Sequence, residues 1–177
     1  MMLDFFKAAA NLKNTPRQGW VEKLGMSNSE SVADHSYLVA VICMVFSDIG
    51  RHDSEKIIKM ALLHDLAESI TGDLIPGQTD RLEKARAEDD AFARIVGMLP
   101  ESARKQYVQI WKEYAEGETA EAKMVHQIDK LEMALQARLY GEQGQPEEKL
   151  GAFFASAKDG IEDPGLASLL DEITGDR

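Results

Sequence analysis

Apolar residues recur along most of the chain at the three-to-four-residue spacing of one helix face. No window shows the sustained alternation of apolar and polar residues that is typical of a half-buried strand. The sequence therefore predicts an all-α protein. The predicted helices are a first one that ends before Pro16, Ser31 to about Ile49, Glu55 to about Ile70 with Ser54 as N-cap, about Asp80 to Met98, one that begins at Pro100, Thr119 to about Tyr140, and two short ones separated by Gly160 and Pro164.

The segments between these helices are short, which bears on the number of domains. The stretch from Gly72 to Thr79 contains Gly, Asp, Pro and Gln, a composition that indicates a loop. Short connections leave no evident domain boundary, and 177 residues suffice for one domain with a sizeable core. We therefore expect residues 1–177 to form a single helical bundle of roughly seven to nine helices without a significant sheet.

The charge of the chain limits the partners it can have. Lys and Arg total 20 against 31 Asp and Glu, which gives a net charge of −11. A surface this negative repels a polyphosphate backbone, so a nucleic-acid polymer is not expected as a partner. A small phosphate ester is still compatible, because a local cation or arginine can outweigh the mean field.

Cysteine content and hydropathy indicate the compartment. Cys43 is the only cysteine, so an intramolecular disulfide is impossible, and this fits a reducing environment. The longest apolar stretch, Tyr37 to Phe46, is too short to span a bilayer. Met1 to Lys13 lacks the basic region and apolar core of a secretory signal. We expect a cytoplasmic protein without a membrane partner.

The pair His64-Asp65 lies inside an apolar run of a predicted helix. Burying an imidazole next to a carboxylate is costly unless both are paired or bind a metal. Glu68 follows His64 by four residues and returns to the same helix face, so both side chains can point into one cavity. Asp73 comes just after the predicted helix end, close enough to enter that cavity.

Two further predicted helices each contain a residue whose side chain can bind a metal and whose neighbours are apolar. These residues are His35 and Asp129. Imidazole nitrogens combined with carboxylate oxygens suit Mn²⁺, Fe²⁺, Co²⁺, Ni²⁺ or Zn²⁺. Four protein ligands on an octahedral ion leave positions for a water and a phosphate oxygen, and the ion lowers the pKa of that water. Each residue alone is more often structural, a hydrogen-bonded histidine or a solvated carboxylate. The combination favours a shared cation.

The order His35, His64-Asp65, Asp129 resembles the HD superfamily of metal-dependent phosphohydrolases, and more narrowly the HD domain-containing 5′-deoxynucleotidases. The similarity extends from about Phe6 nearly to the C-terminus. A His-Asp pair alone would be a weak signal, but the complete set in this order is specific. The matching stretches are residues 30–36 (ESVADHS), 64–73 (HDLAESITGD), 120–123 (AEAK) and 127–133 (QIDKLEM).

The resemblance implies a function and a role for each candidate residue. Members dephosphorylate deoxyribonucleoside 5′-monophosphates, tolerate several bases and form homodimers. The cofactor implied is one divalent cation (Mn, Co, Fe, Ni, Zn or Mg), and a second ion is an option at Glu68 and Asp73. The residues implied are His35, His64, Asp65 and Asp129 as metal ligands, Glu68, Asp73 and Arg17 as catalytic groups, and Arg17, Trp20, Asp65 and Asp73 as substrate-binding groups.

Arg17 matches the phosphate-orienting arginine of the family, a role that suits a forked guanidinium. In the family the arginine and its aromatic partner are either adjacent or separated by a Thr-Gly-like pair. Gln18 and Gly19 separate Arg17 from Trp20, which resembles the second pattern. Trp20 can therefore either contact the substrate or pack against the helix that carries His35. The aromatic residues Tyr107, Trp111 and Tyr114 recur at helical spacing, which favours packing or a dimer surface.

Two other functions are compatible with the same residues. One is an HD-type phosphodiesterase or nucleoside triphosphate hydrolase, which needs more room and more positive charge than this acidic chain suggests. The other is a metal-stabilised helical binding protein without turnover. Glu68 separates the two classes, because an enzyme needs its carboxyl group for chemistry and a binding protein does not.

Overall fold

The computed structural model describes residues 2–50, 52–75, 77 and 80–176. These ranges contain ten α-helices, one 3-10 helix and no strand, so the all-α prediction is confirmed. Three of the residues predicted as loop, Pro76, Gln78 and Thr79, lie outside the described residues. The elements are α1 (Met2–Asn11), η1 (Leu12–Asn14), α2 (Gln18–Leu24), α3 (Val32–Gly50), α4 (Ser54–Leu63), α5 (Glu68–Thr71), α6 (Arg81–Val96), α7 (Glu101–Glu116), α8 (Ala120–Glu142), α9 (Glu147–Gly160) and α10 (Pro164–Thr174).

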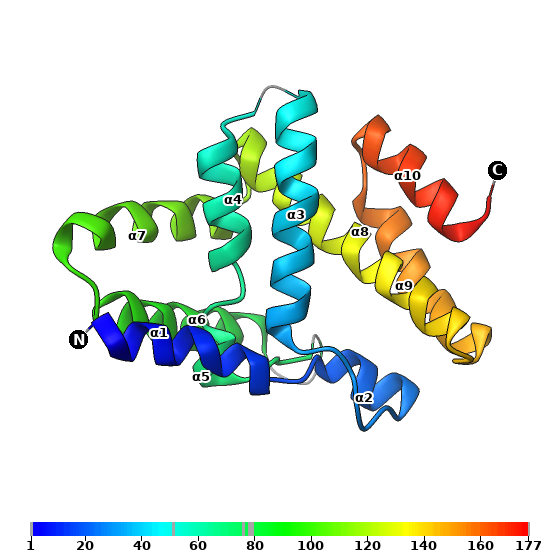
Figure 1. Ribbon diagram of the computed structural model, residues 1–177, viewed down its shortest axis with the longest axis horizontal. Coiled ribbons are helices and arrows are strands. Elements are labelled where there is room, and N and C mark those ends of the chain that lie inside the picture. Colours follow the sequence, from blue (N-terminus) through cyan, green and yellow to red (C-terminus); the bar gives the residue numbers. More distant parts are fainter. Residues whose placement is uncertain (1, 51, 76, 78–79, 177) are drawn as a thin grey trace.

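Helices α3, α4 and α8 form the centre of the molecule (Figure 1). α3 packs against α4 and α8, and α4 also contacts α7. Their fully buried side chains include Val39 and Cys43 on α3, Ile57 on α4, and Ile128 and Leu131 on α8. Each large aliphatic side chain buried in this way contributes about 1.5–3 kcal/mol. Apolar packing therefore fixes the three central helices relative to one another.

The helix predicted from Glu55 to Ile70 is wrong in two respects, of which the first is its cap. The carboxylate of Asp53 accepts a hydrogen bond from the backbone N–H of Lys56 at 3.0 Å. Ser54 is therefore the first helical residue and not the N-cap. Both residue types are good caps, so the sequence alone does not separate neighbours.

The second error concerns the segment around the His-Asp pair. α4 ends at Leu63, and α5 resumes as a single turn at Glu68. Between them the N–H of Leu66 bonds to the carbonyl of Leu63 at 3.1 Å, which is the tighter spacing of a 3-10 turn. His64 and Asp65 thus lie at an interruption and not in mid-helix. If α4 and α5 are counted as one interrupted helix, the described chain has nine α-helices.

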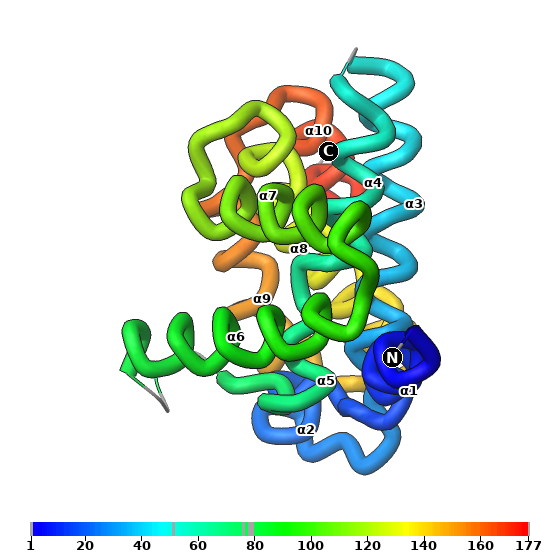
Figure 2. The backbone as a smooth tube through the Cα atoms, turned by 90° about the vertical axis from the view of Figure 1, so that its left-hand side faces the viewer, coloured from blue at the N-terminus to red at the C-terminus, as the bar shows by residue number. Residues whose placement is uncertain are grey.

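α2 is a short helix that the apolar pattern did not predict. It ends at Gly25, whose backbone is left-handed with φ 71°. Its Trp20 and Leu24 pack against Tyr140 of α8 and Phe153 of α9 in a second apolar cluster. This cluster holds the segment that carries Arg17 against the end of α8, and Figure 2 shows α2 below α5 and α6.

α3 is the one described helix whose length and composition would allow it to cross a membrane. The structure extends the apolar segment from Tyr37 to Phe46 to a helix of 19 residues. A helix in the core of a bundle meets the same criteria, and α3 buries His35, Val39 and Cys43 in the protein. Its other side is uncovered, because Tyr37 is 69% exposed and Ile49 is 74% exposed.

Candidate metal centre and substrate cavity

The four predicted metal ligands lie together. Nε2 of His35 is 3.2 Å from Oδ1 of Asp129, 3.3 Å from Nε2 of His64 and 3.6 Å from Oδ2 of Asp65. Nε2 of His64 is 3.2 Å from the same oxygen of Asp65. Residues separated by up to 94 positions therefore meet at one point (129 − 35 = 94).

Each ligand is placed by a different part of the central packing. His35 is on the first turns of α3, His64 caps the C-terminal end of α4, and Asp129 lies midway along α8. The 3-10 turn that follows α4 carries Asp65. His64 and Asp65 are consecutive at the point where the helix is interrupted, and both side chains lie next to Nε2 of His35.

Mutual interactions shift the pKa values of these groups strongly. Burial and Arg17 lower the pKa of His35, but hydrogen bonds to Asp129 and Glu132 outweigh them and raise it to about 10. Burial raises the pKa of Asp129, but His35 and His64 more than offset this and lower it to about 2. The same two histidines lower the pKa of Asp65. The arrangement of these side chains therefore stabilises positive charge at the point where they meet.

This donor set fits a divalent cation. His35, His64 and Asp129 each offer a ligand atom within 4.8 Å of the others, and Asp65 adds a carboxylate oxygen beside them. Two imidazole nitrogens with two carboxylate oxygens are a typical environment for first-row divalent ions. Without a cation, protons on the histidines must balance the two carboxylates, which explains the raised pKa of His64 as well as that of His35.

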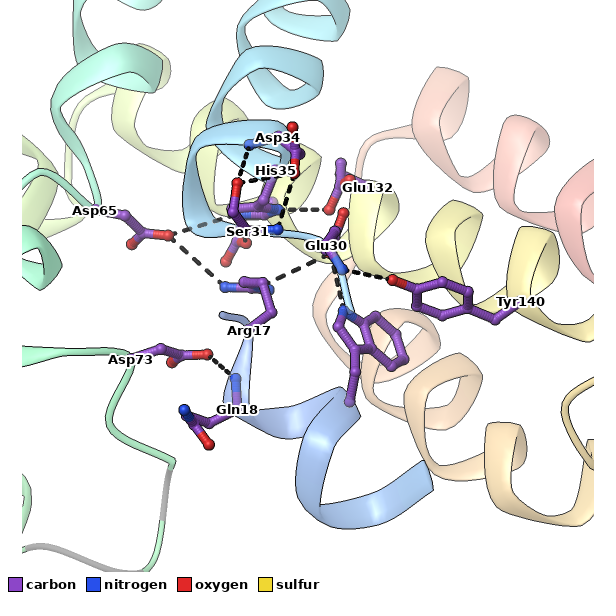
Figure 3. Close-up of polar contacts among 12 residues, drawn as sticks. Arg17, Gln18, Glu30, Ser31, Asp34, His35, Asp65, Asp73, Glu132 and Tyr140 are labelled. Carbon is purple, nitrogen blue, oxygen red and sulfur yellow. Dashed lines mark hydrogen bonds and ion pairs between the residues drawn. The ribbon is translucent and has the colours of Figure 1, made fainter. Parts of the chain in front are cut away.

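Arg17 reaches the edge of this cluster from the loop before α2. One guanidinium nitrogen lies 3.7 Å from Oδ2 of Asp65, and Nε lies 3.9 Å from Oε1 of Glu30 (Figure 3). Burial lowers the pKa of Arg17, but Asp65, Asp129 and the other carboxylates outweigh it and raise the pKa above its usual value. The guanidinium is therefore held as a permanent cation next to the metal ligands.

Glu68 and Asp73 are two further acidic residues near Asp65. The side chain of Glu68 is buried, and Oε2 has no hydrogen-bond partner among the described residues. Burial, together with the charges of Asp65 and Asp73, raises the pKa of Glu68 to about 10. One oxygen of Asp73 accepts a hydrogen bond from the backbone N–H of Gln18 at 2.8 Å, which ties the loop after α5 to the start of α2 (Figure 3).

A cavity of about 640 Å³ opens over these residues, within the size range of small-molecule sites. Its wall comes from α2, the loop after α5, α6, α7, α8 and α9. Arg17, His64, Asp65, Glu68, Asp73 and Asp129 all line it. His35 is fully buried behind this surface and reaches the site only through Nε2.

Comparison with known proteins identifies the fold. A family model described as an HD domain matches residues 9–166. The chain belongs to the HD domain family. The human protein "5′-deoxynucleotidase HDDC2" is 37% identical over 99% of this chain and 86% of its own length, and the Dictyostelium discoideum protein of the same name is 38% identical over 99% and 97%. The resemblance found from the motifs is therefore confirmed.

A solved structure supports the same assignment for the fold of this HD domain. A conserved hypothetical protein from Pyrococcus furiosus superposes with a TM-score of 0.81 at 32% sequence identity, covering 97% of this chain and 98% of that one. The helical arrangement that brings α3, α4 and α8 together is thus an arrangement found in an experimentally determined protein.

The HD domain uses Trp20 mainly for packing. Only 1% of Trp20 is exposed, although it borders the cavity. Its ring lies edge-on to Tyr140 at 5.2 Å and tilted against Phe153 at 4.2 Å, and Nε1 donates a hydrogen bond to Glu30 at 2.8 Å. The helix against which Trp20 was expected to pack, α3, is not its main contact.

Three residues at the site were not recognised in the sequence. The spacing of Tyr114 predicts packing or a dimer surface, yet Tyr114 lines the cavity, and its ring lies edge-on to His64 at 5.6 Å. Glu30 and Glu132 lie within 4.8 Å of one ring nitrogen of His35. A glutamate in a helix or loop has no local signature of burial, and Tyr114 has the spacing of an ordinary core residue.

Proposed function

We propose that this protein hydrolyses deoxyribonucleoside 5′-monophosphates to a nucleoside and inorganic phosphate, with a divalent cation held by His35, His64, Asp65 and Asp129. The observation that carries the proposal is the meeting of these four side chains beside the guanidinium of Arg17, at the floor of one cavity. The similarity to proteins named 5′-deoxynucleotidase supports the choice of substrate.

The cation and Arg17 have separate roles in the proposed hydrolysis. A cation bound there would supply hydroxide near neutral pH and offset negative charge on the phosphoryl group. Arg17 can donate paired N–H groups to phosphate oxygens, which orients the phosphorus toward the metal ligands. Its ion pairs with Asp65 and Glu30 hold the guanidinium in place before substrate arrives.

Glu68 is suited to proton transfer. The raised pKa keeps its carboxyl group protonated near neutrality in the metal-free protein, and a cation bound nearby would lower that pKa toward the working pH. Such a group can give a proton to the departing 5′ oxygen or accept one from water. Asp73 is an acceptor, so it can bind a sugar hydroxyl, and it lies on the same cavity wall.

Phosphate release from a panel of substrates tests the proposal. The panel contains dAMP, AMP, dATP and a cyclic nucleotide, each assayed with Mn²⁺ and with Co²⁺. We expect turnover of dAMP, and a loss of about 10²–10⁴-fold in kcat for Glu68→Gln while the fold and metal binding are kept. Hydrolysis of dATP or the cyclic nucleotide alone would favour the phosphodiesterase or triphosphate alternatives. No turnover of any substrate with either metal would favour the binding-protein alternative.

The same proposal includes a homodimer. The uncovered side of α3 presents Tyr37, Met44, Val45 and Ile49 to solvent, with exposures between 45% and 74%. Four large apolar side chains on one helix form the kind of patch that usually marks a protein contact. Sedimentation of the protein and of Ile49→Lys is the test, and a concentration-independent monomer for the unaltered chain would refute it.

Two further expectations accompany this proposal. A cytoplasmic location is supported by the single free thiol, Cys43, which is buried, and cell fractionation would test it. The assignment of residues 1–177 to one domain stays a prediction, and limited proteolysis would test it.

A further inference from the structure

Glu132 is a fully buried carboxylate that has no part in the reaction described above. It lies on α8, three residues after Asp129, and is 0% exposed. Its Oε2 is 2.5 Å from Nδ1 of His35, and Oε1 has no hydrogen-bond partner among the described residues (Figure 3). A buried carboxylate with one oxygen unsatisfied is unfavourable by itself, so its one strong contact indicates a function.

The two nitrogens of His35 face different groups. Nε2 points at Asp129, Asp65 and His64, where a cation would lie, and Nδ1 points at Glu132 on the opposite side of the ring. A metal-bound imidazole carries its remaining proton on the other nitrogen, and that nitrogen then needs an acceptor. We infer that Glu132 is a positioning residue, an inference that rests on the cation site proposed above. Its carboxylate accepts a hydrogen bond from the Nδ1–H of His35 and so directs the lone pair of Nε2 toward the metal.

The second histidine ligand has the same arrangement with a different acceptor. Nδ1 of His64 is 2.7 Å from the backbone carbonyl oxygen of Ala61. Both ligands are therefore held with Nδ1 as donor and Nε2 directed to the site. His35 alone has a charged acceptor, and a carboxylate raises the basicity of a ligating imidazole more than a carbonyl does. Glu132 is thus expected to strengthen the bond from His35 in particular.

The neighbouring Glu30 does not share this role, although its carboxylate lies within 4.8 Å of a ring nitrogen of His35 and of the carboxylate of Glu132. Its Oε1 accepts a hydrogen bond from Nε1 of Trp20 and lies near Nε of Arg17. Glu30, Glu132 and His35 have the donor types of a second metal site. The 2.5 Å contact between Glu132 and Nδ1 leaves no room for an ion between them, so Glu132 acts by hydrogen bonding.

The test is metal affinity measured by calorimetry with Mn²⁺ for two variants, Glu132→Gln and Glu132→Asp. The first removes the charge and keeps the length, and the second keeps the charge and withdraws the oxygen from Nδ1. Each is expected to weaken Mn²⁺ binding about 10–100-fold. The matched control is Glu121→Gln, which makes the same charge change on the same helix but pairs with Lys56 away from the site. Its affinity should equal that of the unaltered protein.

A spectroscopic measurement needs no variant and covers the case in which both variants fail to fold. In the Zn²⁺-loaded protein, nitrogen-15 spectra should show Nδ1 of His35 protonated and its proton shifted far downfield by the short hydrogen bond. Unchanged Mn²⁺ affinity in folded variants, or a zinc bond through Nδ1, would overturn the inference. If the unaltered protein binds no cation at all, the proposed function fails first, and the two failures are distinguishable.

Discussion

The packing role of Trp20 makes a quantitative prediction. The substitution Trp20→Phe keeps an aromatic ring next to Tyr140 and Phe153 but removes the N–H that bonds to Glu30 at 2.8 Å. A buried acceptor left without a partner costs about 1–3 kcal/mol. The guanidinium of Arg17, whose Nε is 3.9 Å from Oε1 of Glu30, recovers part of that cost, and the space left by the smaller ring adds to it. We therefore expect a loss of about 2 kcal/mol, near the middle of that range.

For a domain of this size, 1 kcal/mol corresponds to a shift in Tm of about 2–4 °C, so Trp20→Phe should lower Tm by about 4–8 °C. Thermal unfolding followed by circular dichroism measures this. The KM for dAMP should change less than threefold, because only 1% of Trp20 is exposed to the cavity. A variant with unchanged Tm and a KM raised more than tenfold would show that Trp20 contacts the substrate and would refute the packing role.

Three other perturbations have expected results. Lys56 pairs with Glu113 and Glu121, and its hydrogen bond lowers the pKa of Glu121 below the ordinary value of 4.5. The stability that Glu121 contributes is therefore fully present above pH 4.5 and is lost as the pH falls through the lowered pKa. Lys56→Met should destabilise by about 1 kcal/mol at pH 7 and by less at pH 3, and an equal loss at both pH values in urea titrations would contradict the ion pair. Burial raises the pKa of the Cys43 thiol to about 12, so Ellman's reagent should react with it only in denaturant, and fast labelling of the native protein would contradict its burial. Mn²⁺ at a hundred times its Kd should stabilise the protein by about 2.7 kcal/mol and raise Tm by about 5–11 °C relative to EDTA, and equal Tm values would exclude a bound ion.

The long helices were predictable because their apolar spacing is regular. α3 begins and ends within one residue of the prediction. α8 begins one residue after its predicted start, because Thr119 is the N-cap and accepts a hydrogen bond from the backbone N–H of Ala122. α2 was missed because seven residues give too few turns for a periodicity to emerge. The break after α4 was missed because residues 61–67 are as apolar and helix-compatible as the preceding turn.

The four metal ligands were predictable because each is a polar residue in an apolar segment, where burial without a partner is unfavourable. The fold brings these four side chains together. The expectation that His64 and Glu68 share a helix face rested on an unbroken helix. Both line the cavity, but a 3-10 turn places them there. Glu132 could not be separated from a solvated glutamate by sequence, because its burial depends on the packing of α3 against α8. Which group accepts the hydrogen bond from the second nitrogen of a histidine ligand depends on the tertiary structure.

Anomalous scattering from a crystal of the Mn²⁺-loaded protein tests the shared cation most directly. One peak is predicted at bonding distance from Nε2 of His35 and His64 and from a carboxylate oxygen of Asp65 and Asp129. A peak confined to Glu68 and Asp73, or no peak among the four side chains at saturating Mn²⁺, would contradict a common site.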